Sequence, residues 1–237
     1  MKYEILRKNV AFSLAEVLIV IGLIGIVASL TLPNLNSSTN KKEMVTRYMK
    51  VYAELSAAAG SAVAKYGPIT SWVANASTDT EKSTIVGKRL LSYMKVSKEC
   101  GIDTDNTNAK CGTSGTVKYM KTSGGAGGIY TDSNKNDYKA ILANGISISI
   151  SGYGTPSIEV DIDGRQNSYM WGKDYFGFNI DSDTGEVKPY GWDKTEADML
   201  SDCKSIGQAC GNWVVRAGNM DYLKCPDSLT WTNTTCK

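Results

Sequence analysis

The most constraining feature of this chain is a run of apolar residues close to its start. Residues 12–32 hold a single charged residue, Glu16, and no lysine or arginine. A helix of roughly 20 apolar residues is long enough to cross the hydrocarbon core of a bilayer. Basic residues precede the run, and this bias keeps the preceding segment cytoplasmic. We therefore expect a single-pass anchor in the inner (cytoplasmic) membrane, with the chain after Pro33 periplasmic or extracellular.

Glu16 is the unusual member of this run. A carboxylate near the centre of a membrane helix costs about 2.5–3.5 kcal/mol, so an acidic residue there is functional by default. A secretory signal peptide would end in small residues, and Ser29-Leu30-Thr31 is a poor version of that pattern. A cleavable secretory signal or an inert anchor is therefore the weaker interpretation.

The motif Ala11-Phe12-Ser13-Leu14-Ala15-Glu16, followed by an apolar helix, resembles the N-terminal signature of type IV pilins and type II secretion pseudopilins. The resemblance covers residues 1 to about 66. Pro33 stands where the family often has a helix-bending proline, and Ala11 where it usually has glycine. The resemblance implies that residues 1–11 are a leader peptide, that a prepilin peptidase cuts between Ala11 and Phe12, and that the new amino terminus is N-methylated.

The same resemblance implies assembly into a filament. The subunit would join copies of itself, or other pilins or pseudopilins, at an inner-membrane assembly platform. The ammonium of Phe12 on one subunit would neutralise the Glu16 carboxylate of its neighbour, and at low dielectric such a pair is strongly favoured over either charge alone. Gly22, Gly25 and Ser29 form a small-residue strip suited to helix packing. The implied function is a structural subunit of a type IV pilus or a type II secretion pseudopilus, present at the cell surface after assembly.

Helical periodicity resumes after Pro33. Apolar residues recur on one face between residues 41 and 66, and Gly67-Pro68 ends the pattern. The sequence therefore divides into four parts: a leader (1–11), a transmembrane and polymerisation helix (12–33), an amphipathic helix (34–66) and a globular head (67–237).

The head carries a series of strand signals. Residues 138–143 and 146–151 flank Asn144-Gly145, a strong hairpin signal, and 157–162 and 175–180 extend the series. In residues 146–151 isoleucines alternate with serines, the pattern of a strand with one buried face. Such a meander must bury its apolar face, and the amphipathic helix can cover it. We predict an α+β fold: a long N-terminal helix packed on an antiparallel meander, with a disulfide-stapled C-terminal region. Two short helices are expected, at 81–95 and 196–201.

Six cysteines follow the apolar run: Cys100, Cys111, Cys203, Cys210, Cys225 and Cys236. No two are spaced as Cys-x-x-Cys, and the spacings are wider than those of zinc sites. An even number of cysteines on the expected outer side of the membrane favours disulfides. Six cysteines allow fifteen connectivities. We favour the pairing of sequence neighbours, because each bridge then closes a short polar loop.

One group of oxygen-bearing side chains suits a metal ion: Asp161, Asp163, Asn167 and Asp174 surround a predicted turn. Carboxylate and amide oxygens are calcium ligands, although the spacing does not match an EF-hand. Some pseudopilins hold calcium in a loop of the sheet. Asp163-Gly164 also works simply as a turn between strands. The sequence favours a simple turn over a metal site. Bound Ca²⁺ is the alternative, and we expect no other cofactor.

Composition argues against catalysis and against nucleic acid. The chain contains no histidine, which removes the commonest general base and the usual partner of a Ser or Cys nucleophile. The net charge of +2 equals that of the first eleven residues, so the rest is neutral and offers no basic patch. We therefore expect that the protein is not an enzyme and that it has no nucleic-acid partner.

Two other functions stay open at this point. One is a monomeric, membrane-anchored extracellular binding module with calcium as a candidate ligand, whose helix only tethers it. The other is an extracytoplasmic enzyme that works through carboxylates, such as a glycosidase. Glu16 separates the filament subunit from the anchored module, because a tether tolerates its loss.

Overall fold

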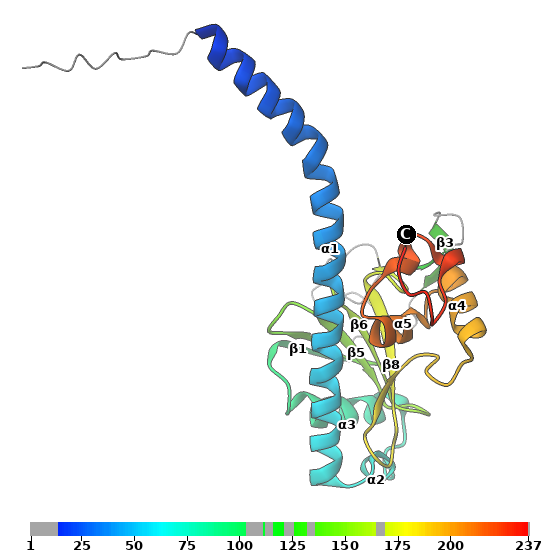
Figure 1. The fold of residues 1–237 in the computed structure, drawn as a ribbon. Helices are drawn as coiled ribbons and strands as arrows, with labels where there is room; N and C mark the ends of the chain where they lie inside the picture. Colours follow the sequence, from blue (N-terminus) through cyan, green and yellow to red (C-terminus); the bar gives the residue numbers. More distant parts are fainter. Residues whose placement is uncertain are drawn as a thin grey trace, which may run out of the picture. The chain divides into compact units, whose positions relative to one another are not determined.

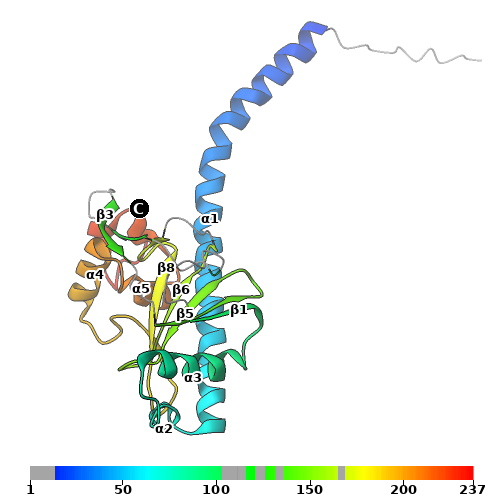
Figure 2. The same ribbon diagram turned by 180° about the vertical axis from the view of Figure 1, so that it is seen from behind.

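The computed structural model describes residues 14–102, 111, 116–120, 126–131, 136–164 and 169–236. Helix α1 (Leu14–Tyr66) is its first element. The chain forms two compact units, residues 1–42 and 43–237, so α1 contributes to both. Figures 1 and 2 show the elements from opposite sides.

Unit 1 consists, in its described part, of residues 14–42 of α1. The helix is assigned through Pro33 without interruption, and the expected bend there stays a prediction. In the part of the chain that the structure describes, no helix has the length and apolar character needed to span a membrane. The leader, Ala11 and Phe12 lie outside the described residues.

Unit 2 is built on a six-stranded sheet in the order β1-β4-β5-β6-β8-β9, and every neighbouring pair is antiparallel. The strands are β1 (Val96–Ile102), β4 (Tyr138–Leu142), β5 (Ser147–Ser151), β6 (Ser157–Asp161), β8 (Tyr175–Ile180) and β9 (Val187–Pro189). A smaller sheet has the order β3-β2-β7, and its strands are β2 (Thr116–Met120), β3 (Ala126–Thr131) and β7 (Tyr169–Met170). The predicted α+β class with an antiparallel meander is confirmed for this unit.

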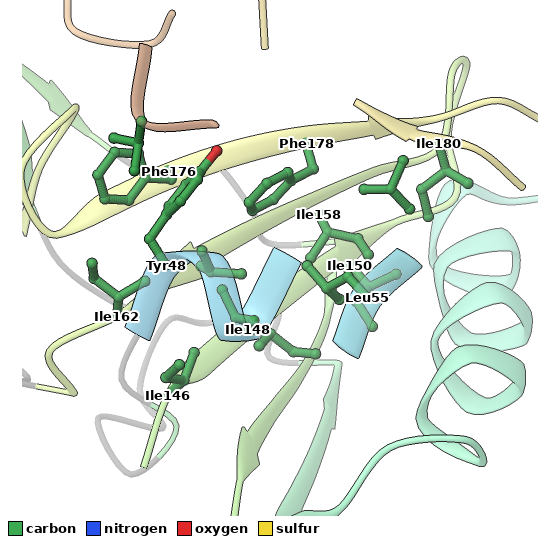
Figure 3. Packing of buried hydrophobic residues seen from close by; sticks show 14 of the residues in the cluster. Tyr48, Leu55, Ile146, Ile148, Ile150, Ile158, Ile162, Phe176, Phe178 and Ile180 are labelled. Carbon is green, nitrogen blue, oxygen red and sulfur yellow. The ribbon is translucent and has the colours of Figure 1, made fainter. Parts of the chain in front are cut away.

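Residues 43–66 of α1 cover one face of the larger sheet. Tyr48 and Leu55 point toward isoleucines of β5 and β6 and toward Phe176 and Phe178 of β8 (Figure 3). The ring of Tyr48 lies 4.6 Å from that of Phe176, centroid to centroid. The Tyr52 hydroxyl also donates to the carbonyl of Val187 at 3.2 Å. The amphipathic helix therefore supplies the cover that the sheet requires.

Two further helices, α2 (Ile69–Trp72) and α3 (Asp79–Leu91), follow α1. Helix α3 begins with a capping box in which Thr78 and Glu81 satisfy each other's backbone N–H groups. It packs against β4 and β5 (Figure 2). Gly87 makes this approach possible, because a Cβ atom there would lie 2.6 Å from the ring of Tyr138.

The opposite face of the sheet is also buried around β5, which corrects the expectation of a strand with one buried face. Ser147 and Ser149 of β5 are 3% and 0% exposed, and Ile148 between them is 0% exposed. The Ser149 hydroxyl donates to Asp137 at 3.0 Å. At the β6–β8 end, Tyr175 belongs to a second buried aromatic cluster with Tyr169 and Trp171, against which Tyr190 packs. Polar side chains in this layer are buried because partners bring them together, which alternation alone does not reveal.

The C-terminal region contains α4 (Glu196–Ser205), α5 (Cys210–Ala217), η2 (Asp221–Leu223) and η3 (Pro226–Ser228). All six cysteines form disulfides, as expected: Cys100–Cys111, Cys203–Cys210 and Cys225–Cys236. The Cα–Cα distances are 6.2, 4.8 and 5.8 Å, respectively. These pairs are the sequence neighbours that we favoured.

Candidate functional site

The apolar segment at the start of α1 is uncovered on every side. Residues 17–21 are five consecutive apolar residues, and each side chain is between 49% and 64% exposed. Successive residues of an α-helix are about 100° apart, so five of them sample the whole circumference. Within the described chain, no face of this segment is buried. A helix that is apolar all round is normally enclosed by other helices or by lipid.

Glu16 lies on this segment, one residue before Val17. Its backbone is helical, and its side chain is outside the described residues. Ala11 and Phe12 are outside them as well. Cleavage at Ala11-Phe12 and the pairing of Glu16 with a neighbouring amino terminus therefore stay predictions.

The part of α1 in unit 2 shows the opposite pattern. Tyr48, Val51, Leu55, Ala59 and Ala62 are each at most 1% exposed. They recur at intervals of three and four residues, so one face of the helix is buried. The other face carries the small residues Ala53, Ala57, Gly60 and Ala64, which are exposed. This face leaves room for another chain to approach closely.

The aspartates of the calcium hypothesis lie where β6 ends. Asp161 is 0% exposed, and its Oδ1 accepts hydrogen bonds from the backbone N–H groups of Asp163 and Gly164, both at 3.2 Å. This arrangement is an Asx turn. Asp174 is also buried, and its Oδ1 accepts a bond from the backbone N–H of Met170 at 2.5 Å. The predicted turn is therefore present, and Asn167 lies outside the described residues.

One atom of this turn has no partner. Asp161 Oδ2 is buried and makes no hydrogen bond within the described part of the chain. Burial, together with the neighbouring Asp163 carboxyl, raises the pKa of Asp161 to about 8. Burial also raises the pKa of Asp174 to about 6; the hydrogen bond from Met170 offsets part of this rise, and the charge of Asp163 adds a smaller increase. A proton or a hard cation on Oδ2 would relieve this arrangement.

The geometry of a full metal shell is not present, however. Among the described residues, no three acidic or cysteine side chains converge as metal ligands do. Asp161, Asp163 and Asp174 have the chemistry to hold Ca²⁺, with further oxygens required from elsewhere. Calcium therefore stays a hypothesis, and the turn is what the backbone hydrogen bonds establish.

The structure also forms a groove that sequence patterns did not indicate. Asn179 of β8, Lys188 of β9 and Trp192 in the following loop line a hollow of about 310 Å³. An adjoining hollow of about 320 Å³ shares Asn179 and extends to Gln208. These residues come from separate segments and carry no motif. Only the fold brings them together.

The structure thus places part of the predicted sites. It pairs the cysteines and builds the aspartate turn. It leaves Ala11, Phe12, Asn167 and the side chain of Glu16 outside the described residues. A comparison of the chain with models of protein families, with curated proteins and with solved structures finds no match.

Proposed function

We propose that this chain is a structural subunit of a membrane-assembled filament, of the type IV pilus or type II secretion pseudopilus kind. The observation that carries the proposal is the uncovered apolar segment at residues 17–21. Exposed apolar surface of this extent marks a contact with lipid or with other protein. The neighbouring motif at residues 11–16 favours contact with both lipid and other subunits, because it resembles the motif of subunits that pass from the membrane into a helical filament.

In this proposal the two units have different tasks. Residues 12–33 hold the subunit in the inner membrane and then pack against the same segment of neighbouring subunits. Residues 67–237 form the head that the filament displays. The exposed small residues at 53, 57, 60 and 64 lie beyond the membrane segment and allow neighbours to pack closely along the outer part of the helix.

Processing and assembly then follow from the chemistry of two residues. A prepilin peptidase removes residues 1–11 and exposes the amino group of Phe12, which is methylated. That ammonium meets Glu16 of an adjacent subunit at the assembly platform. Each charge is costly alone in an apolar setting, so the pair fixes the register of each added subunit.

Mass spectrometry of the mature amino terminus tests the assignment. The expected mature protein begins at a methylated Phe12. A matched variant, Ala11→Glu, replaces the small residue before the cut and should accumulate as full-length precursor. A mature wild-type protein that keeps Met1, or that begins near Leu32, would exclude the pilin-like subunit.

The groove beside Trp192 favours a second candidate, a membrane-anchored extracellular binding module. In that case the helix of residues 12–33 serves only as a tether, with no need for Glu16 or for cleavage. Filament formation by the wild-type chain separates the two functions, since the anchored module would act as a monomer.

A further inference from the structure

The groove of unit 2 has the size of a small-ligand site. Its two hollows, of about 310 and 320 Å³, share Asn179, Gly191 and Lys194. Sites for small molecules span roughly 300–1,000 Å³, so each hollow is at the lower end of this range. The walls are the edge of the larger sheet at β8 and β9, the loop that follows Pro189, and the segment around Gln208.

The lining combines two aromatic rings with neutral polar groups and charged groups. Trp192 and Tyr190 supply the rings, Asn179 and Gln208 supply amides, and Asp193 adds a carboxylate. The ammonium of Lys188 lies 3.2 Å from Glu186, and that of Lys194 lies 3.1 Å from Asp202. Both lysines are thus balanced by carboxylates. An anionic ligand would require unbalanced cations, and an apolar ligand would require an apolar lining.

Arg216 holds the side chain and the backbone of Trp192 in position. The guanidinium of Arg216 lies 4.6 Å from the centre of the indole ring, and its Nη2 donates to the carbonyl of Trp192 at 3.3 Å. Arg216 occupies one face of the ring, and Trp192 also lines the groove. The ring is therefore held in place before any ligand arrives, which lowers the entropic cost of binding.

The loop that carries Trp192 is held by a buried amide. Asn212 is 1% exposed, donates to the carbonyl of Gly191 at 2.8 Å and accepts from Nε of Arg216 at 2.9 Å. Gly191 has a φ of +71°, and a Cβ atom there would lie 2.8 Å from that of Ala209. The groove is thus shaped by groups that satisfy one another.

We propose that this groove binds a neutral pyranose sugar. One face of a pyranose ring presents C–H groups, which pack against the negative face of an aromatic ring. Its hydroxyls both donate and accept hydrogen bonds, and so do amide side chains and lysine–carboxylate pairs taken together. This activity goes beyond a role in a filament, because it gives the head a ligand of its own.

Binding is tested on the full chain, kept in a detergent without a sugar headgroup. Saturation-transfer NMR is recorded with the methyl pyranosides of glucose, galactose, mannose and N-acetylglucosamine, and tryptophan fluorescence is titrated with each. We expect at least one sugar to bind with a dissociation constant on the order of 1 mM. Absence of binding by all four at 100-fold higher concentration, or displacement of the sugar by inorganic phosphate, would overturn the proposal.

Variants locate the site. Trp192→Ala and Asn179→Ala should each weaken binding at least about tenfold, since each removes a central contact. Tyr153→Ala is the matched control: Tyr153 is 62% exposed, and its aromatic ring does not line the groove. Its affinity should be unchanged. If circular dichroism shows that Trp192→Ala does not fold, the affinity of Asn179→Ala tests the site instead, because Asn179 is exposed. Equal affinity in Asn179→Ala and wild type would contradict the proposed site, whereas filament formation by Asn179→Ala should be normal in either case.

Discussion

The two parts of helix α1 have the same backbone structure and opposite environments. Residues 17–21 have apolar side chains around the whole circumference, and none of them is buried within the described chain. Residues 43–66 have an apolar face of three- and four-residue spacing, and the sheet of unit 2 buries it. Within the described residues, the chain therefore covers one part of the helix and leaves the other exposed. The proposed filament accounts for this difference, because it gives residues 17–21 a cover outside their own chain.

The largest expected effect comes from replacing Glu16, next to the exposed part of the helix. We predict that Glu16→Ala is inserted and cut normally but forms no filaments, because the ammonium of Phe12 would be buried without its partner at a cost of about 3–5 kcal/mol per subunit. The matched control is Glu43→Ala, which removes an exposed carboxylate 2.8 Å from Arg47 on the same helix. A pair of that kind contributes about 0.2–1 kcal/mol, so filaments should persist. Electron microscopy and membrane fractionation read out both variants, and filaments from Glu16→Ala would refute the pairing mechanism.

A second prediction compares how much a leucine in each part of α1 contributes to the stability of the head. Leu55→Ala should lower the free energy of unfolding of the head by about 2–5 kcal/mol, because Leu55 is only 1% exposed in a packed core. Leu18→Ala should leave it within about 0.5 kcal/mol, because Leu18 is 56% exposed. Denaturant titration of the full chain measures both. Similar losses from the two variants would show that the first part is also packed within its own subunit.

A third prediction concerns the disulfides of the head. Alkylation without reductant should label none of the six cysteines. Replacing both Cys203 and Cys210 by alanine should then lower the free energy of unfolding by about 2–4 kcal/mol, since the bridge that joins α4 to α5 no longer restrains the unfolded chain. Two or more labelled thiols in the native protein would contradict the pairing.

A fourth prediction uses the buried aspartate. The pKa of Asp161 is raised in the folded protein, to about 8, so its protonation favours the folded state. Its contribution is complete below the unfolded pKa of about 4 and is lost as the pH rises to about 8. The melting temperature of the wild type should fall over this pH range, and that of Asp161→Asn should fall less. Each kcal/mol of lost stability corresponds to a fall of roughly 2–4 °C. Equal slopes for the two proteins would show that Asp161 is not protonated in the fold.

The smallest expected effect is that of calcium. If Ca²⁺ occupies the turn, millimolar calcium should raise the melting temperature at pH 8 relative to chelator, because binding to the folded state alone stabilises it. Asp161→Asn should abolish the difference. Identical melting of the wild type in calcium and in chelator would remove the site from consideration.

Sequence patterns identified the features that are set by neighbouring residues. Asn144-Gly145 forms the expected turn, in which Gly145 has a φ of +84° and Asn144 Oδ1 accepts a bond from the N–H of Ile146. The buried stripe of residues 48–62 follows directly from helical spacing. The cysteine pairs join residues only 7 to 11 positions apart.

Features that depend on distant segments were missed. The edge strands β1 and β9 are short or polar, and β1 pairs with β4 across about 40 residues, so no local pattern revealed them. We expected Asp161 within the strand at 157–162 and beside a turn, but no local pattern revealed its complete burial at the last residue of β6. The groove at Trp192 depends on Arg216 and Asn212, two residues of α5 with no recognisable spacing to it.

The long sequence distance between α1 and its cover has a consequence for synthesis. The guanidinium of Arg47 donates to the carbonyl of Ile162, 115 residues later, and the hydroxyl of Tyr52 donates to that of Val187, 135 residues later. Until the ribosome has produced β6, β8 and β9, the buried stripe of α1 lacks a large part of its cover. Contacts this distant in sequence form slowly, and an apolar stripe left open meanwhile is prone to aggregation. For most of its synthesis the chain therefore leaves the apolar stripe of residues 48–62 without its partners.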